Sequence, residues 1–171
     1  MKTRKSKAIT LMALGIAIIF ILTRFTQIPI PFGYMHFGNV AILLACAYLD
    51  PFSAMIVSAA GSALADLTSF PVWVIPTIII KGVMALAGSC VMGEGYRSIR
   101  LNSPRIILGC LASACIMIFG YFVSGVFMYG GVAASATQLP GLTFEGVAAI
   151  VLFFVIANVL EKAKVTRLLS D

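Results

Sequence analysis

The chain has 171 residues, of which 61% are hydrophobic and only 11% are charged, and its mean hydropathy is +1.07. Because charged residues make up about a quarter of an ordinary globular chain, this composition excludes a soluble protein and indicates that lipid surrounds most of the chain. At about 20 residues per spanning helix, the length allows roughly five to seven spans and leaves no room for a built-in soluble domain such as an ATPase.

Six apolar runs follow one another along the chain, separated by breaks of different kinds. A segment with two prolines and a glycine, 25–36, predicts an outer loop after the first run. Asp50 and Pro51 form a helix-start signal after the second run. Residues 94–105 are a polar, basic connection, and 130–141 are a loop rich in Gly, Ala, Ser and Thr. The runs predict membrane-spanning helices at about 8–23, 37–49, 52–69, 71–93, 106–129 and 142–160.

The basic residues test this count of six. The formal net charge is +6, but the cations form no stripe with interleaved aromatic residues, so nucleic acid is not an expected partner. Cytoplasmic loops are enriched in Lys and Arg, and an even number of spans separates each pair of clusters. We therefore predict an all-α integral membrane protein with six transmembrane helices, both termini cytoplasmic, and a single membrane-embedded domain over 1–171. The three clusters are Lys2, Arg4, Lys5 and Lys7; Arg97, Arg100 and Arg105; and Lys162, Lys164 and Arg167.

Two charges lie inside apolar runs, Asp66 in the third and Lys81 in the fourth. An ionised side chain at this depth costs several kcal/mol unless it is paired or hydrated. The third and fourth helices are expected to be antiparallel neighbours, so the two charges could form a structural ion pair. Alternatively, one or both could reach a polar ligand in an outward-facing cavity.

Polar and aromatic residues gather at the expected outer ends of the helices. Tyr34, His36 and Asn39 come from the first outer loop and the start of the second run, and Trp73 and Tyr121 lie near other outer ends. These aromatic residues could belong to the interfacial belt or form a box around a flat heterocycle. The single histidine has no second metal ligand nearby, so no metal is expected. Two further charges, Arg24 and Glu145, could be ordinary boundary residues or lie at the mouth of a cavity.

The first helix carries a pair of small residues, and the sequence as a whole lacks enzyme motifs. Ala13 and Ala17 form a small-xxx-small pair, which lets another helix approach closely in lipid; internal packing is the alternative. The four cysteines have no metal-ligand spacing and are expected to act as small buried hydrophobic residues. The sequence contains no Walker A, HExxH or GxSxG motif, so we expect neither an enzyme nor a bound cofactor.

Three stretches in order, 34–39 (YMHFGN), 61–66 (GSALAD) and 76–82 (PTIIIKG), carry a resemblance to a known family. The chain resembles the substrate-binding S components of energy-coupling factor (ECF) vitamin transporters, in the branch with riboflavin-type and hydroxymethylpyrimidine/pyridoxine-type components. The resemblance covers most of the chain. Asn39 departs from the pattern, in which Asp is commoner, and this puts the charge or donor pattern of the ligand in doubt.

The resemblance implies a membrane-embedded vitamin-binding subunit in a bacterial cytoplasmic membrane. It implies high-affinity binding at the outer face, with the first loop as a lid, and delivery by a transmembrane T component and two ABC-type ATPase subunits. The Ala13–Ala17 pattern matches the docking surface for the T component. The expected substrate-binding residues are Tyr34, His36, Asn39, Asp66, Trp73, Lys81 and Tyr121.

The identity of the vitamin and two other functional classes stay open. An aromatic and polar lining suits a small planar heterocycle with hydroxyl or amine groups. The resemblance favours a small pyridoxine-like or hydroxymethylpyrimidine-like vitamin over the larger riboflavin. A self-contained secondary transporter would be expected to show an internal inverted repeat, and none is evident. A structural subunit without a ligand would leave Asp66 and Lys81 as an ion pair only.

Overall fold

The computed structural model describes residues 2–93 and 101–164 of the chain, with side chains from residue 6 onward. Its elements in order are α1 (Lys2–Phe25), β1 (Ile28–Ile30), β2 (Gly33–Met35), α2 (Gly38–Tyr48), α3 (Pro51–Ser69), the 3-10 helix η1 (Pro71–Trp73), α4 (Val74–Met92), α5 (Pro104–Met128), α6 (Val132–Ala136) and α7 (Leu139–Lys162). The expectation of a helical membrane protein is confirmed, with one small hairpin added.

The start of α3 and the end of α4 lie at residues that suit a helix end. Asp50 caps α3 by accepting a hydrogen bond from the Ser53 backbone N–H at 3.0 Å, and proline occupies the first turn. Gly93 ends α4 with φ +74°, a left-handed conformation that favours glycine. These signals explain why the predicted boundaries of the third and fourth spans lie within one residue of the observed helical ends.

Five helical segments are long and apolar enough to cross a bilayer: Ser6–Phe25, Pro51–Ser69, Pro71–Met92, Pro104–Met128 and Val132–Lys162. The remaining helix, α2, has only 11 residues, or about 16 Å of rise, roughly half of a hydrocarbon core. The six-span prediction is therefore reduced to five helices of spanning length and one short helix. Ten of the eleven residues of α2 are buried, because it lies inside the bundle in contact with α1, α3, α4, α5 and α7.

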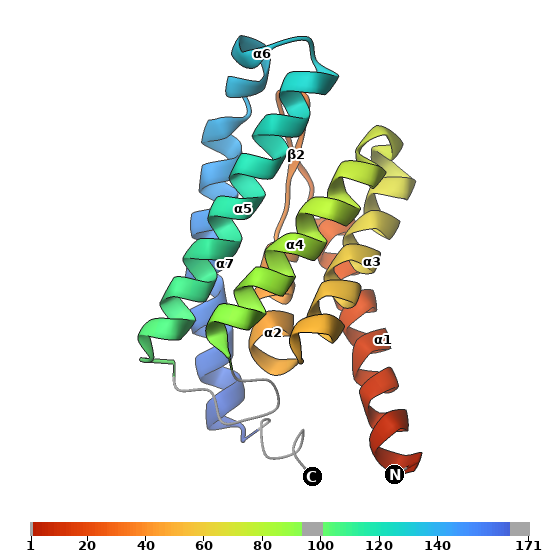
Figure 1. Ribbon diagram of the computed structural model, residues 1–171, viewed down its shortest axis with the longest axis vertical. Helices are drawn as coiled ribbons and strands as arrows, with labels where there is room; N and C mark the ends of the chain where they lie inside the picture. The colour runs from red at the N-terminus through yellow and green to blue at the C-terminus, as the bar shows by residue number, and fades with distance from the viewer. Residues whose placement is uncertain (1, 94–100, 165–171) are drawn as a thin grey trace.

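The arrangement of the helices is visible in Figure 1. Helix α3 packs along α4, α4 packs along α5, and α7 closes the bundle against α2 and α5. Close approach of α1 and α3 depends on Gly61, where a Cβ atom would lie 2.8 Å from the Ile19 Cβ and 2.9 Å from the Ile16 carbonyl oxygen. The start of α1 and the end of α7 lie at one end of the bundle, and the hairpin and α6 lie toward the other end, which we call the upper end.

Both predicted outer loops contain regular structure. In 25–36, β1 and β2 pair in antiparallel register, with Ile28 opposite Met35 and Ile30 opposite Gly33. Phe32 at the turn has φ +61°, which is uncommon for a bulky residue. Its carbonyl oxygen accepts hydrogen bonds from Trp73 Nε1 at 3.3 Å and the Tyr129 hydroxyl at 2.9 Å. In 130–141, the short helix α6 and the first turn of α7 replace the expected loop.

Large apolar side chains cover the outer surface of the bundle, as a lipid-facing surface requires. The lower interior is also apolar and closely packed, and includes Ile42, Cys46, Met84, Met92 and Phe153, each at most 1% exposed. The upper interior contrasts with it. The buried polar and charged residues there come from α1, α2, α3, α4, α7 and the residues just before α2 and α7, and they form the candidate site.

Candidate functional site

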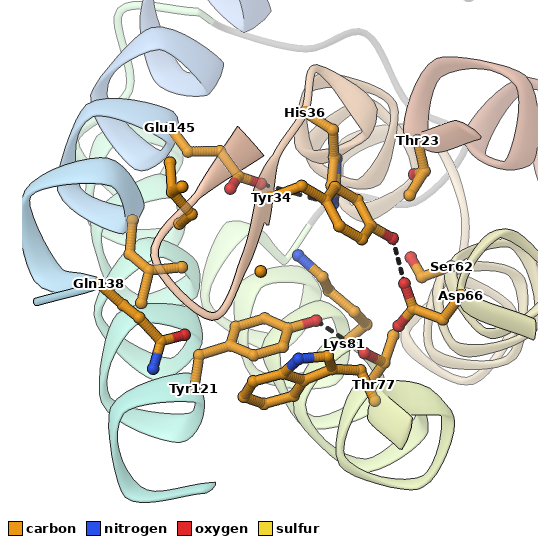
Figure 2. A pocket seen from close by; sticks show the side chains of 14 residues that line it. Thr23, Tyr34, His36, Ser62, Asp66, Thr77, Lys81, Tyr121, Gln138 and Glu145 are labelled. Carbon is orange, nitrogen blue, oxygen red and sulfur yellow. Dashed lines mark hydrogen bonds and ion pairs between the residues drawn. The ribbon is translucent and has the colours of Figure 1, made fainter. Parts of the chain in front are cut away.

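A small cavity lies beneath the hairpin at the upper end of the bundle (Figure 2). Its volume of about 30 Å³ is large enough for water but far below the roughly 300 Å³ or more of a typical small-molecule site. Most of the side chains around it are polar or aromatic, and they come from α1, the hairpin, α3, η1, α4, α5, the residue before α7, and α7 itself. The lining residues are Thr23, Ile30, Gly33, Tyr34, His36, Ser62, Asp66, Trp73, Thr77, Lys81, Tyr121, Gln138, Leu142 and Glu145.

Lys81 and Glu145 are joined through the amide of Asn39. The Lys81 ammonium donates to Asn39 Oδ1 at 2.6 Å, and Asn39 Nδ2 donates to Glu145 Oε1 at 2.6 Å. All three side chains are at most 5% exposed. An amide suits this position because its oxygen accepts from a cation while its nitrogen donates to an anion. The bridge thus compensates two buried charges from different helices.

His36 lies on the other side of Glu145, with its Nε2 atom 3.6 Å from Glu145 Oε1. The Gly38 backbone N–H donates to His36 Nδ1 at 3.0 Å, so Nδ1 is the unprotonated nitrogen and Nε2 carries the hydrogen that faces the carboxylate. Burial lowers the pKa of His36 well below its ordinary value, and the positive charge of Lys81 lowers it further. The imidazole is therefore neutral at physiological pH.

Asp66 is paired with the hairpin. The Tyr34 hydroxyl donates a short hydrogen bond to Asp66 Oδ1, and Gln27 Nε2 donates to Ser69 Oγ one turn further along α3 at 2.9 Å. Burial raises the pKa of Tyr34 far above its ordinary value, and the negative charge of Asp66 adds to this effect. Tyr34 therefore remains a hydrogen-bond donor, and this contact fastens the hairpin onto α3.

Aromatic side chains form a wall of the cavity next to Lys81. Trp73 and Tyr121 meet edge to face with ring centroids 5.4 Å apart, and Thr77 Oγ1 lies 2.9 Å from the Tyr121 hydroxyl. The Lys81 ammonium lies 5.1 Å from the centre of the Tyr121 ring, within the range of a cation–π contact. The ring of Phe32 stacks on Tyr129 at 4.5 Å and holds the hairpin turn over this wall.

The structure brings the predicted site residues together, with one change of role. Six of the seven line the cavity: Tyr34, His36, Asp66, Trp73, Lys81 and Tyr121. Asn39 is 1% exposed and lies behind the cavity, where it holds Lys81 and Glu145. Asp66 and Lys81, both of which the structure describes, form no direct ion pair within 4.0 Å; each has found a different partner. Contact with a ligand stays a prediction for all seven.

Several lining residues were not predicted. Ser62 and Thr77 each lie four residues before a predicted site residue, Asp66 and Lys81, so helical periodicity could have placed them on the same face. For Glu145, the sequence allows either a boundary charge or a residue at the mouth of a cavity. Its side chain lines the cavity and is 5% exposed. Nothing in the sequence marked Thr23 or Gln138. Among the described residues, no group of three or more His, Cys, Asp or Glu side chains is placed to hold a metal ion.

The predicted docking residues lie far from this cavity. Ala13 and Ala17 are exposed on α1, whereas Gly15 and Ile19 of the same helix face α3. Internal packing within this chain therefore does not explain the two alanines. The loop and tail cations at residues 94–100 and 165–171, including Arg97, Arg100 and Arg167, lie outside the described residues.

Comparison with known proteins connects this geometry to a family. Residues 3–162 match the family described as "ECF-type riboflavin transporter, S component". A protein of Pyrococcus woesei, described as an uncharacterized protein in the gap 3' region, is 32% identical over 110 residues, which are 63% of this chain and 71% of that one. A solved structure of the S component of a bacterial ECF transporter covers 92% of this chain and 97% of its own, with a TM-score of 0.75 and 21% identity. This last likeness shows the fold alone.

Proposed function

Because the chain belongs to the family of ECF-type riboflavin transporter S components, which are vitamin-binding transporter subunits, we propose that it captures a small, flat, water-soluble vitamin at the upper end of the bundle. The observation that carries this proposal is the cavity beneath the hairpin. It combines a neutral imidazole, a compensated Lys81–Glu145 pair, Asp66 and the Trp73–Tyr121 wall. A concave site with aromatic walls and a few convergent polar groups is typical of small-molecule binding.

The favoured ligand is a single-ring heterocycle of the pyridoxine or hydroxymethylpyrimidine class. Polar groups surround the cavity on several sides, and its volume is only about 30 Å³, so any vitamin requires the hairpin to move outward. A single ring with hydroxyl or amine substituents requires less movement than a fused three-ring system. The substituents of a single ring also lie close together, so they can form several hydrogen bonds with the polar side chains at once.

Riboflavin is the second candidate, and the description of the matching family favours it. Two measurements distinguish the single-ring class from riboflavin. Native mass spectrometry of the purified protein reports the mass of any retained ligand, and binding isotherms give the affinities for pyridoxine, hydroxymethylpyrimidine and riboflavin. Tighter binding of a single-ring vitamin supports the favoured class. Tighter binding of riboflavin contradicts it in favour of the second candidate, and binding of none of the three contradicts the proposed function.

We propose further that ATP-driven uptake requires a transmembrane T component, which docks at Ala13 and Ala17, and two ABC-type ATPase subunits. The sequence has no nucleotide-binding motif, and the exposed alanines of α1 allow close helix approach in lipid. Ala13→Trp or Ala17→Trp is expected to abolish ATP-dependent uptake in reconstituted vesicles and to leave vitamin affinity unchanged. Val151→Trp, at an exposed position of α7, is the matched control and should support uptake.

Three outcomes would contradict the docking proposal. A parallel loss of binding and uptake in the alanine variants would show that Ala13 and Ala17 support the fold. Uptake by vesicles that contain this chain alone would indicate a self-contained secondary transporter, and a chain that neither binds nor transports a vitamin would be a structural subunit.

The placement in the cell membrane, with six helices and both termini in the cytoplasm, is also a proposal. The start of α1 and the end of α7 lie at the same end of the bundle (Figure 1), as an even number of crossings requires. In a background without the native cysteines, Lys162→Cys should react with an impermeant reagent only after the cells are opened. Gly130→Cys should react in intact cells, and the reverse pattern would contradict the orientation.

A further inference from the structure

Two buried hydroxyl groups line one side of the cavity without a hydrogen-bond partner. Thr23 on α1 is 1% exposed and Ser62 on α3 is 0% exposed, and both side chains line the cavity. Among the residues that the structure describes, neither hydroxyl oxygen has a partner. Figure 2 shows Ser62 beside Asp66 and Thr23 beyond Ser62 toward His36, both on the side of the cavity opposite Gln138.

These two hydroxyls differ from others on the same helices. Thr68 Oγ1 and Ser69 Oγ on α3 donate to the Ala65 carbonyl oxygen at 2.8 Å and 2.7 Å, and Thr10 Oγ1 on α1 donates to the Ser6 carbonyl oxygen at 3.0 Å. Such bonds to the preceding turn are the usual arrangement for helical Ser and Thr. Because a buried polar group without a partner is unfavourable, Thr23 and Ser62 are available for a partner inside the cavity.

We propose that Thr23 and Ser62 form a subsite for an uncharged hydroxyl group of the ligand, next to the carboxylate of Asp66. The inference rests on the proposed function and adds to it the chemistry of one end of the vitamin. The side chains of Thr23 and Ser62 can each donate or accept, so they match a group that does both. Asp66 already accepts from Tyr34 and has further lone pairs that can accept from the same ligand hydroxyl.

The neighbouring charge selects against other ligand groups at this subsite. A carboxylate or phosphate of the ligand would lie beside Asp66 and be repelled in a site of low dielectric. The cation that lines the cavity, Lys81, donates to Asn39 toward the Glu145 side. The subsite therefore distinguishes a free vitamin with its hydroxyl from a form that is phosphorylated or lacks the oxygen.

The test compares ligands that differ in their hydroxyl groups, using variants that also differ in hydroxyl groups. The probes are pyridoxine with 4-deoxypyridoxine, and riboflavin with lumiflavin, which retains the isoalloxazine ring system and carries a methyl group in place of the hydroxylated chain. Binding is followed through the fluorescence of Trp73, which is the only tryptophan and lines the cavity. The variant is Thr23→Val/Ser62→Ala, and the matched control is Ser58→Ala. Ser58 is also buried, has no partner among the described residues and lies one turn from Ser62, but it does not line the cavity.

The parent protein should bind the hydroxylated member of its preferred pair about tenfold or more tightly than the other member. The double variant should lose this preference, binding both members with the lower affinity, while its melting temperature stays equal to or above that of the parent because no intramolecular bond is lost. Ser58→Ala should keep the parent preference.

Unchanged discrimination in the double variant overturns the subsite and leaves the proposed function intact, and so does a lowered melting temperature with discrimination retained. A parent that binds none of the four probes overturns the subsite, and it overturns the proposed function as well if hydroxymethylpyrimidine also fails to bind. The outcome also identifies the class of ligand, since the pair that the parent discriminates is either the pyridoxine pair or the flavin pair.

Discussion

The upper and lower halves of the same helices have opposite interiors. At its upper end, α4 presents Thr77 and Lys81 to the cavity, whereas further down it presents Met84, Ala85 and Met92 to an apolar core. Helix α7 changes in the same way, from Glu145 above to Ala149, Phe153 and Ala157 below, and α2 changes after Asn39. Each of these helices therefore lines the polar site along one part of its length and packs into an apolar core along the next.

Under the proposed function, the upper half provides the binding site for the vitamin, whereas the lower half offers no polar route for its translocation. In the lower half, apolar side chains at 0–8% exposure fill most of the interior, and the buried hydroxyls of Ser89 and Ser113 donate to backbone carbonyl oxygens. No polar path therefore continues from the cavity to the lower end through the described residues. A polar vitamin bound above cannot pass through this core in the observed arrangement. Release on the other side therefore requires a movement of the chain as a whole or of its helices, which agrees with a subunit that works together with partners.

Removal of the Lys81 charge should have the largest effect on the upper half. Lys81→Met removes the cation that compensates Glu145 through Asn39, and breaking a buried pair of this kind costs about 3–5 kcal/mol. We expect a loss of that size in the free energy of unfolding in detergent, and loss of vitamin binding. Chemical denaturation and a binding isotherm measure the two effects.

A second substitution identifies the partner of Lys81. Glu145→Gln in the Lys81→Met background removes the uncompensated charge and should recover most of the stability. Asp66→Asn in the same background should recover less, because Asp66 is paired with Tyr34. Equal recovery by both would show that Lys81 compensates the two acids alike, and recovery by Asp66→Asn alone would contradict the bridge through Asn39.

A cavity in the lower half should affect stability without affecting binding. Phe153 is 0% exposed and lies against Phe154 with ring centroids 5.2 Å apart. Phe153→Ala should lower the free energy of unfolding by about 3 kcal/mol, while the folded fraction keeps the parent affinity. Phe144→Ala, at a position that is 60% exposed, is the control for loss of a ring facing outward. A matching loss of affinity in Phe153→Ala would show that the two halves are coupled.

The polarity of the Asn39 bridge can be tested with an isosteric change. Asn39→Asp places a carboxylate where the amide nitrogen lies 2.6 Å from Glu145 Oε1, so the two acids must share a proton or repel each other. We expect vitamin affinity about 10- to 100-fold weaker at pH 8, with recovery as the pH falls and one acid becomes protonated. Glu145→Gln in the Asn39→Asp background should restore binding at pH 8, because the new amide can donate to the new carboxylate.

The sequence predicts the location of the site better than it predicts the side-chain contacts within it. Asp66 and Lys81 were marked because charges within apolar runs are unfavourable, and both line the cavity. Their partners could not be predicted, because Asn39 and Glu145 are 106 residues apart in sequence and only the packing of α2 against α7 joins them. Glu145 was assigned near a helix end because the last span was expected to begin at residue 142. Helix α7 begins at Leu139 instead, which places Glu145 about two turns inside.

The hairpin shows a second limit of the sequence. Pro29, Pro31 and Gly33 correctly predicted a break in the helices, but the two strands have only three residues each. Too few alternating positions are present for a period of two to be recognised. The contacts that hold the hairpin, from Tyr34 to Asp66 and from Trp73 and Tyr129 to Phe32, are long-range and become evident only in the folded chain.

The smallest expected effect concerns His36, at the boundary between the hairpin and the bundle. Its pKa is well below the ordinary value in the folded state, first because of burial and then because of Lys81, and it returns to about 6.5 on unfolding. Below about pH 6.5 the unfolded chain therefore binds a proton that the folded chain does not, so stability is complete above this pH and falls as the pH decreases. His36→Gln cannot take up this proton. Relative to the variant, the parent should lose up to about 1.4 kcal/mol of stability per pH unit below pH 6.5, measured by denaturation at pH 7.5 and 5.5.

Glu145, Asp66 and Lys81 are present in both proteins, so the comparison isolates the imidazole. A constant difference between parent and variant across this range would show that His36 is protonated in the folded protein.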